Sequence, residues 1–224
     1  MGRFFKSSIG RKVAMALSAF FLMFFLLQHL AINLLSVFNP DTFNEVSHFM
    51  GTNPVVQFAL QPVLIFAVVF HFVMGFILDI KNRKANGGGY VKNNGAANST
   101  WFSRNMIISG ITILAFIVLH FIDFWFPELN VKYIQGDMSG MLPGETEFRY
   151  HEELVHKFAH PARVVAYVVA FVFLGLHLAH GFTSAFQSVG AAALRKKLNT
   201  VGNAYAILVP LGFIVIAIYH YFNH

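Results

Sequence analysis

Five long apolar runs dominate the sequence and restrict it to one class of fold. Each exceeds the roughly 20 residues that an α-helix needs to cross a bilayer. Only 12% of the residues are charged, against roughly 25% in a soluble domain. We therefore predict an all-α integral membrane protein, a single domain over residues 1–224 that forms a bundle of five transmembrane helices. The predicted spans are residues 13–38, 55–80, 102–126, 161–186 and 201–222.

Prolines are placed where helices begin, end or bend. Pro54, Pro127 and Pro161 are expected to mark ends of spans, because proline lacks the N–H that a helix interior needs. Pro62 and Pro210 fall within spans and are expected to kink them. The polar residues 128–160 are expected to form a loop outside the bilayer, with a short surface helix over residues 145–158.

Basic residues are concentrated in alternate loops and so predict the orientation of the bundle. Twelve of the 16 Lys and Arg residues fall on one predicted side, whereas acidic residues dominate the other. By the positive-inside rule, the N-terminus is cytoplasmic and the chain is a multi-pass protein of the cell inner (cytoplasmic) membrane. The sequence pI of about 9.7 reflects these loops, so nucleic acid is not an expected partner. The twelve residues are Arg3, Lys6, Arg11, Lys12, Lys81, Arg83, Lys84, Lys92, Arg104, Arg195, Lys196 and Lys197.

Four histidines lie deep in four consecutive apolar runs: His29, His71, His120 and His177. An imidazole inside hydrocarbon is costly and by default marks a functional site. The chain has no Cys, which excludes thiolate ligation of an iron–sulfur cluster and covalent attachment of a c-type haem. Haem held by side chains remains compatible with the sequence.

The predicted orientation sorts these histidines by depth. His29 and His120 come late in spans that run outward, so both are expected in the outer half of the membrane. His71 and His177 come late in spans that run inward, so both are expected in the inner half. Two ligands at each of two levels predict two stacked bis-histidine haems, which carry electrons because no iron position stays open.

Other residues near these histidines are candidates for the haem surroundings. Gly75 and Gly181 each follow a predicted ligand by four residues, where a missing side chain would admit a macrocycle or simply let helices pack. His180 lies nearly on the same face as His177. Depth favours His177 as the ligand, with His180 near a propionate or in a structural hydrogen bond.

Several segments together resemble the cytochrome b subunit of succinate:quinone oxidoreductases, in its single-anchor, two-haem branch that includes quinol:fumarate reductases. The segments are Gln28-His29-Leu30, Phe43-Asn44, Ser47-His48-Phe49-Met50 and the span-4 segment from His177 to Gln187. The resemblance covers essentially the whole chain.

The resemblance implies a membrane anchor, with a flavoprotein subunit and an iron–sulfur subunit docked on the cytoplasmic face. Electrons from succinate, a metabolite of the tricarboxylic acid cycle, would pass through two haems b to a quinone, expected to be menaquinone, or in reverse for fumarate reduction. The implied axial ligands are His29, His71, His120 and His177; the family's span-4 ligand lies four residues before a glycine, which again selects His177. Some fumarate reductases of this branch carry a proton-transferring Glu where this chain has Gly175, so that proton route is not expected here.

The quinone site and the propionate partners are assigned by position. His48 is the first candidate for the quinone site, because that site needs groups that donate to carbonyl oxygens and exchange protons. Glu45 lies near it in the sequence. Arg11 or Arg104 at the inner edge and Arg163 at the outer edge are candidates for binding propionates.

Two other readings remain open. The first is a di-haem b subunit of another quinone-linked oxidoreductase, such as a hydrogenase or a formate dehydrogenase, which would have the same haem bands and a different partner. A metal-ion transporter lined by histidines is the second, but its carboxylate candidates, Asp79 and Asp123, are expected at span ends rather than near the midplane.

Overall fold

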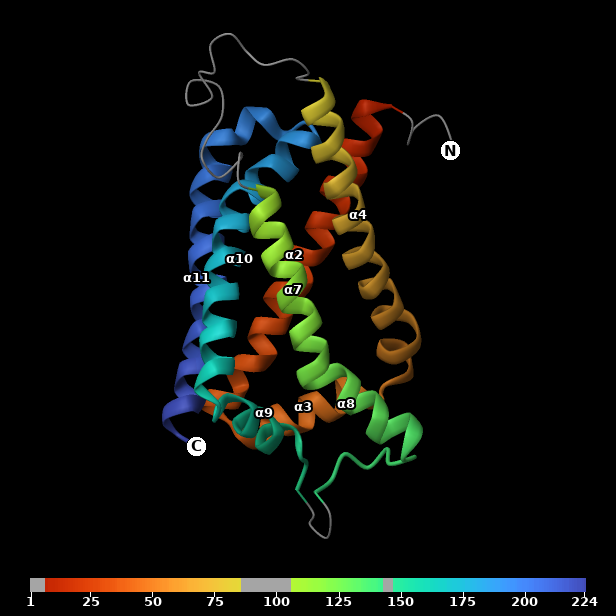
Figure 1. Cartoon of the computed structure of the whole chain (residues 1–224), viewed down its shortest axis with the longest axis vertical. Coiled ribbons are helices and arrows are strands. Elements are labelled where there is room, and N and C mark those ends of the chain that lie inside the picture. The colour runs from red at the N-terminus through yellow and green to blue at the C-terminus, as the bar shows by residue number, and fades with distance from the viewer. Residues whose placement is uncertain (1–6, 86–105, 143–146) are drawn as a thin grey trace.

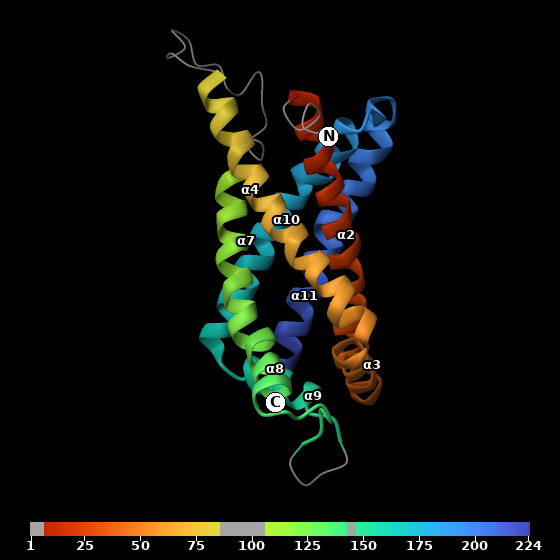
Figure 2. The ribbon, with the colours of Figure 1, turned by 90° about the vertical axis from the view of Figure 1, so that its right-hand side faces the viewer.

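The computed structural model describes residues 7–85, 106–142 and 147–224. Within these ranges the chain is almost entirely helical and contains no β-strand, as the sequence predicts. Five helices are long and apolar enough to span a membrane, and Figures 1 and 2 show them running side by side as an elongated bundle. These helices cover Ser8–Phe38, Val56–Asn82, Met106–Ile134, Pro161–Ser188 and Arg195–Phe222.

The first helix, α2 (Ser8–Phe38), and the short α3 (Pro40–Thr52) show how local sequence sets helix ends. Ser7 caps α2 by accepting a hydrogen bond from the Gly10 amide at 2.9 Å. Asn39 ends α2 and caps α3 by accepting from the Thr42 amide at 3.0 Å, with proline at the first position of α3. Asn and Ser side chains are favoured caps, and proline there loses no helical hydrogen bond.

The second and third spans each contain a π-helical turn next to a proline. In the second, η1 (Val56–Leu60) leads into α4 (Gln61–Ala85), and Pro62 is the second residue of α4. In the third, α7 (Met106–His120) continues through η2 (Phe121–Trp125), α8 (Phe126–Leu129) and η3 (Asn130–Ile134). A π-bulge shifts the hydrogen-bond pattern, so the N–H that proline lacks is accommodated and the helix continues.

The third span therefore corrects three predictions. Pro127 does not end a helix, because it lies at the start of α8 inside a helical segment that runs to Ile134. The polar loop was predicted to begin at residue 128, but the helical segment continues to Ile134 and the loop begins only after it. Asp123 is likewise not at the end of a span but within the helix, and its side chain is buried.

The remaining elements close the bundle. Pro54 and Pro161 begin helices as predicted, and the surface helix is shorter than predicted: α9 spans Tyr150–Phe158. Spans four and five are α10 (Pro161–Ser188) and α11 (Arg195–Phe222), joined by η4 (Ala191–Leu194). Pro210 lies inside α11.

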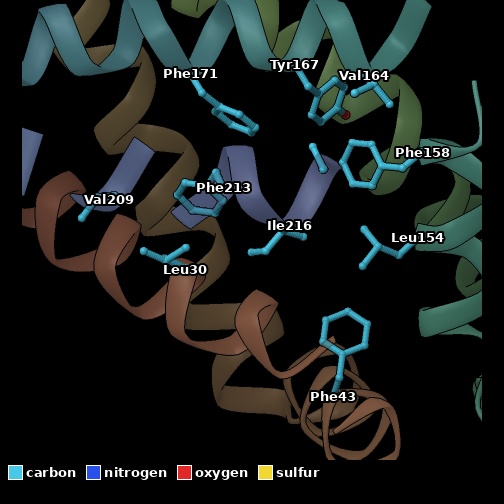
Figure 3. Close-up of a cluster of buried hydrophobic side chains, with 11 residues drawn as sticks. Leu30, Phe43, Leu154, Phe158, Val164, Tyr167, Phe171, Val209, Phe213 and Ile216 are labelled. Carbon is cyan, nitrogen blue, oxygen red and sulfur yellow. The ribbon is translucent and has the colours of Figure 1, made fainter. Parts of the chain in front are cut away.

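The best-packed part of the molecule lies toward the end that carries α3 and α9, called here the α9 end. Helix α10 packs against α11, α7 and α2, and α4 packs mainly against α2. Large side chains from α2, α3, α9, α10 and α11 meet in one buried cluster (Figure 3). Its members include Leu30, Phe43, Phe158, Tyr167, Phe171 and Phe213. This cluster packs together α2 and α10, which carry His29 and His177.

Candidate functional site

The four histidines predicted as haem ligands meet as two pairs. The rings of His29 and His120 have centres 5.8 Å apart, and those of His71 and His177 have centres 6.3 Å apart. Each pair joins two different helices, α2 with α7 and α4 with α10. The pairing is the one that depth predicts from the sequence.

The two pairs lie at separate levels along the bundle. On α2, Ser18 contacts one pair through His71, and His29 belongs to the other pair, eleven residues further along. On α7, Ser109 contacts the first of these pairs through His177, and His120, eleven residues further along, belongs to the second. Eleven residues of helix correspond to about 16 Å at ~1.5 Å per residue. We call His29 and His120 the α9-end pair and His71 and His177 the N-end pair.

The spacing of the rings fits one metal ion held between each pair. Metal–imidazole bonds of about 2.0 Å, plus about 1 Å from each nitrogen to its ring centre, put two such centres about 6 Å apart. The observed 5.8 and 6.3 Å match this separation. Among the described residues, no three or more His, Cys, Asp or Glu side chains gather as a metal site. The four histidines thus meet two by two, the arrangement that a pair of axial ligands would require.

Hydrogen bonds orient the N-end pair. Nδ1 of His71 lies 3.0 Å from Oγ of Ser18, and Nδ1 of His177 lies 3.2 Å from Oγ of Ser109. Ligand histidines commonly use their second nitrogen in this way, which fixes the ring and leaves Nε2 for the metal.

The α9-end pair is held mainly by aromatic rings. Phe25 stacks on His29 with ring centres 5.4 Å apart, and Phe116 stacks on His120 at 5.9 Å. Phe213 lies against the His29 ring at 5.8 Å.

The two helices that carry these histidines repeat the same residues at the same spacings, which the sequence analysis missed. Residues 91 positions apart correspond: Met15 with Met106, Ser18 with Ser109, Phe25 with Phe116 and His29 with His120. Self-comparison of the sequence at a fixed offset finds this repeat. In the structure, corresponding residues make corresponding contacts. Each of the two serines contacts a histidine of the N-end pair, and each of the two phenylalanines stacks on a histidine of the α9-end pair.

Gly75 and Gly181 are part of the same correspondence. A Cβ added at Gly75 would lie 3.6 Å from the methyl carbon of Met15, and one added at Gly181 would lie 3.5 Å from that of Met106. Both are ordinary contact distances, so each glycine faces a methionine of a neighbouring helix across a small space. Packing of helices accounts for this geometry, and a flat group could lie against either glycine only if the flexible methionine side chain moved.

His180, the alternative ligand in span four, does not enter either pair. Within the described residues it makes no ring contact and no hydrogen bond, whereas His177 faces His71. The geometry therefore favours His177 for the N-end pair.

The predicted arginines have different surroundings. Arg11 lies near the start of α2, where its guanidinium is 3.5 Å from the Ser8 hydroxyl. Arg104 lies outside the described residues. Arg163 is partly exposed and forms an ion pair with Asp123, Nη2 to Oδ1, at 2.9 Å.

Asp123 forms the polar centre next to the α9-end pair. Its carboxylate is fully buried, and Oδ2 accepts a hydrogen bond from the Tyr167 hydroxyl at 2.8 Å. The Arg163 contact is an ion pair by distance but is not aligned as a hydrogen bond. Tyr167 also packs edge-on to His120, with ring centres 6.5 Å apart. The buried carboxylate of Asp123 is therefore linked to His120, a predicted ligand, through the ring of Tyr167.

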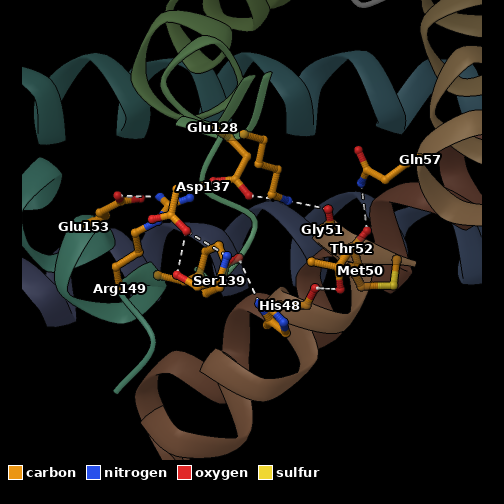
Figure 4. Close-up of polar contacts among 12 residues, drawn as sticks. His48, Met50, Gly51, Thr52, Gln57, Glu128, Asp137, Ser139, Arg149 and Glu153 are labelled. Carbon is orange, nitrogen blue, oxygen red and sulfur yellow. Dashed lines mark hydrogen bonds and ion pairs between the residues drawn. The ribbon is translucent and has the colours of Figure 1, made fainter. Parts of the chain in front are cut away.

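A second polar network crosses the α9 end (Figure 4). Glu128 forms ion pairs with Lys132 at 2.5 Å and with Arg149, and Arg149 also pairs with Glu153 at 2.6 Å. Lys132 donates to the Gly51 carbonyl. Lys132 and Arg149 are both buried. The network therefore ties the end of the third span to α3 and to the start of α9.

His48, the predicted quinone-site residue, lies beside this network. Its ring stacks on Phe148 with centres 4.4 Å apart, and its Nδ1 lies 3.4 Å from the Tyr150 hydroxyl. Burial and the nearby charge of Lys132 lower the pKa of His48. Burial raises the pKa of Tyr150 to about 12. A neutral imidazole and a protonated phenol therefore meet here, and Glu45 lies exposed on the same helix.

Comparison with known proteins gives no relatives. No family model, no curated protein and no solved structure matches the chain. The assignment of function therefore rests on the residues and their geometry.

Two further histidines near the α9 end were not predicted from the sequence. His220 is buried, and its Nε2 lies 2.9 Å from Oγ of Ser36. His151 contacts the Ser36 carbonyl at 3.2 Å, and its ring centre lies 5.4 Å from that of His220. These contacts join α2, α9 and α11 and account for both histidines structurally.

Proposed function

We propose that this chain is the two-haem b membrane anchor of a succinate:quinone oxidoreductase. In this proposal the chain carries electrons between an iron–sulfur subunit and menaquinone, or in the reverse direction as a fumarate reductase. The observation that carries the proposal is the meeting of four intramembrane histidines as two pairs with ring centres 5.8 and 6.3 Å apart.

The residues present fit haem as the group that each pair holds. His29 and His120 would bind one iron, and His71 and His177 the other. Haem ligated in this way supplies one-electron transfer, because two histidines leave no open iron position. The stacked phenylalanines hold the rings of the α9-end pair, and the serine hydroxyls hold those of the N-end pair. The chain's part in the chemistry is thus to hold four imidazoles in two pairs.

The two levels suit electron transfer across a membrane. The pairs are about 16 Å apart along the helices, and the hydrocarbon core is about 30 Å thick. Together they therefore connect the two halves of that core. The N-end pair faces the side rich in Lys and Arg, where we place the flavoprotein and iron–sulfur subunits by the positive-inside rule.

The α9 end supports a quinone site. Quinone reduction needs donors to the carbonyl oxygens and groups that exchange protons. His48 and Tyr150 provide a neutral imidazole and a phenol that touch each other, and the ion pairs around Glu128 hold both supporting segments in place. We place the quinone beside His48, near the α9-end pair.

Absorption spectra of the purified complex test the proposal. We expect reduction by succinate to give b-type haem bands, pyridine haemochrome analysis to give two haems per chain, and a flavoprotein to co-purify. One haem or none per chain contradicts the paired-ligand model. Two haems with a hydrogenase or formate dehydrogenase as the partner would retain the haem sites and reject the succinate assignment.

A further inference from the structure

The two serines of the N-end pair make one more contact each, which determines where protons lie. Oγ of Ser18 donates to the Met15 carbonyl at 2.8 Å, and Oγ of Ser109 donates to the Met106 carbonyl at 2.9 Å. A hydroxyl has a single proton to donate. Both serines are also buried, so water does not replace these partners.

With its proton committed to the backbone, each Oγ accepts from the histidine. His71 and His177 must then carry their proton on Nδ1, which leaves the lone pair of Nε2 directed elsewhere. The serines thus select the tautomer that binds a metal through Nε2. They also hold the ring plane, because the hydrogen bond is directional.

The α9-end pair lacks this arrangement. The atom near Nδ1 of His29 is Nδ2 of Asn33, at 3.4 Å, and that amide nitrogen also donates to the His29 carbonyl at 2.8 Å. An amide nitrogen donates and does not accept, so it cannot take a hydrogen bond from Nδ1–H as a serine oxygen does. Nδ1 of His120 is buried and has no hydrogen-bond partner among the described residues. Among the described residues, the hydrogen bond from a histidine Nδ1 to a serine oxygen therefore occurs only in the N-end pair.

The recurrence of the serines argues that the contacts are not incidental. Both lie eleven residues before a histidine of the other pair, and both bond the carbonyl of a methionine three residues earlier. Neither bond to histidine is local, because the partners are 53 and 68 residues apart in the sequence. The same serine–histidine contact therefore occurs twice, once between α2 and α4 and once between α7 and α10.

We propose that Ser18 and Ser109 are positioning residues that hold the N-end imidazoles as Nδ1–H tautomers and lower the reduction potential of the haem bound there. The inference rests on the proposed haem function. Accepting a hydrogen bond from Nδ1–H makes the imidazole a stronger donor to iron, and second-shell bonds of this kind tune the metal. A stronger donor favours the ferric state, so the potential falls.

Redox potentiometry of the purified complex tests the proposal with matched variants. Ser18→Ala and Ser109→Ala remove the acceptors, while Ser18→Thr and Ser109→Thr keep a hydroxyl. Ser188→Ala is the control, because Ser188 also donates to a backbone carbonyl, that of Ser184 at 2.8 Å, and has no hydrogen bond to a histidine among the described residues. The same serine changes in a His120→Ala background, which keeps only the N-end haem, assign the potentials.

We expect each Ala variant to keep two haems and to raise the N-end midpoint potential. The expected change is about tenfold in the balance between ferric and ferrous forms, which equals about 59 mV for one electron. The other haem and the Ser188→Ala control should not shift, and Thr should restore the original value. Two bound haems with unchanged potentials in both Ala variants, or equal shifts of both haems, overturn the role of the serines while leaving the haem function intact. Absence of haem from the unaltered complex instead rejects the proposed function.

Discussion

Gly175 of α10 packs directly against the carbonyl oxygen of Ala206 on α11. A Cβ added at Gly175 would lie 3.1 Å from that oxygen and 3.6 Å from Cγ of Pro210. Ala206 is four residues before Pro210, so its carbonyl is the one that proline deprives of a helical hydrogen bond. Some fumarate reductases of the branch that the sequence resembles carry a proton-transferring Glu at the corresponding position, whereas here the space is taken by the contact between two helices.

We therefore expect Gly175→Ala to destabilise the chain by about 1–3 kcal/mol, the usual cost of overpacking, and Gly175→Glu to destabilise it more. Thermal unfolding in detergent, followed by circular dichroism, measures both. Val172→Ala on the exposed face of the same helix is the control and should change little. Equal stability of Gly175→Glu and the unaltered chain would show that the helices can separate here.

Single histidine variants should remove haems selectively. His29→Ala and His120→Ala should each lose one haem, and His71→Ala and His177→Ala should each lose the other. His180→Ala should keep both. Pyridine haemochrome analysis with low-temperature spectra gives the count and identity. If His180→Ala loses a haem and His177→Ala does not, the assignment in span four is wrong.

Asp123 should matter for stability because its charge is buried. Breaking a buried ion pair by removing one partner typically costs about 3–5 kcal/mol. Asp123→Ala would leave Arg163 without its carboxylate and Tyr167 without its acceptor. We expect a lower unfolding temperature and a weakened α9-end haem, and a smaller loss when Arg163→Gln is added to the same chain. A double variant worse than Asp123→Ala would argue against the pair.

The charge state of His48 predicts a pH dependence. Its pKa in the folded chain is lower than the ordinary value of about 6.5, because of burial and Lys132. The unfolded chain therefore binds the proton first as pH falls, and the contribution of His48 to stability is lost below about pH 6.5. NMR of histidine-labelled protein in nanodiscs should give a His48 midpoint below that of a free histidine. A midpoint at or above 6.5 contradicts the geometry around Lys132.

His48→Ala tests the quinone site. Both haems should remain, and succinate should still reduce an artificial acceptor, but quinone reduction should fall sharply. Glu45→Gln is a useful comparison, because Glu45 is exposed on the same helix. Unchanged quinone kinetics in His48→Ala would remove this residue from the site. A quinone bound beside the N-end pair would reject the proposed electron path from the N-end pair to a quinone at the α9 end.

The sequence was sufficient for the features that depend on spacing along a helix. The five spans follow from apolar length, and the pairing of the histidines follows from depth, which orientation fixes. It was insufficient where contacts are three-dimensional. Asp123 was predicted at a span end because Pro127 was expected to stop the helix, and the π-turn that accommodates Pro127 has no simple sequence signal. The network of Glu128, Lys132 and Arg149 likewise joins distant segments.

The two histidine pairs are completed at different stages of chain synthesis. Each histidine pair takes one ring from the first two spans and one from the next two, so neither half of the chain can complete a site alone. The α9-end pair is complete once α7 has been made, whereas the N-end pair must wait for α10. In the proposed function, haem binding would therefore follow a fixed order, and a chain truncated before α10 would have one complete histidine pair and one incomplete pair.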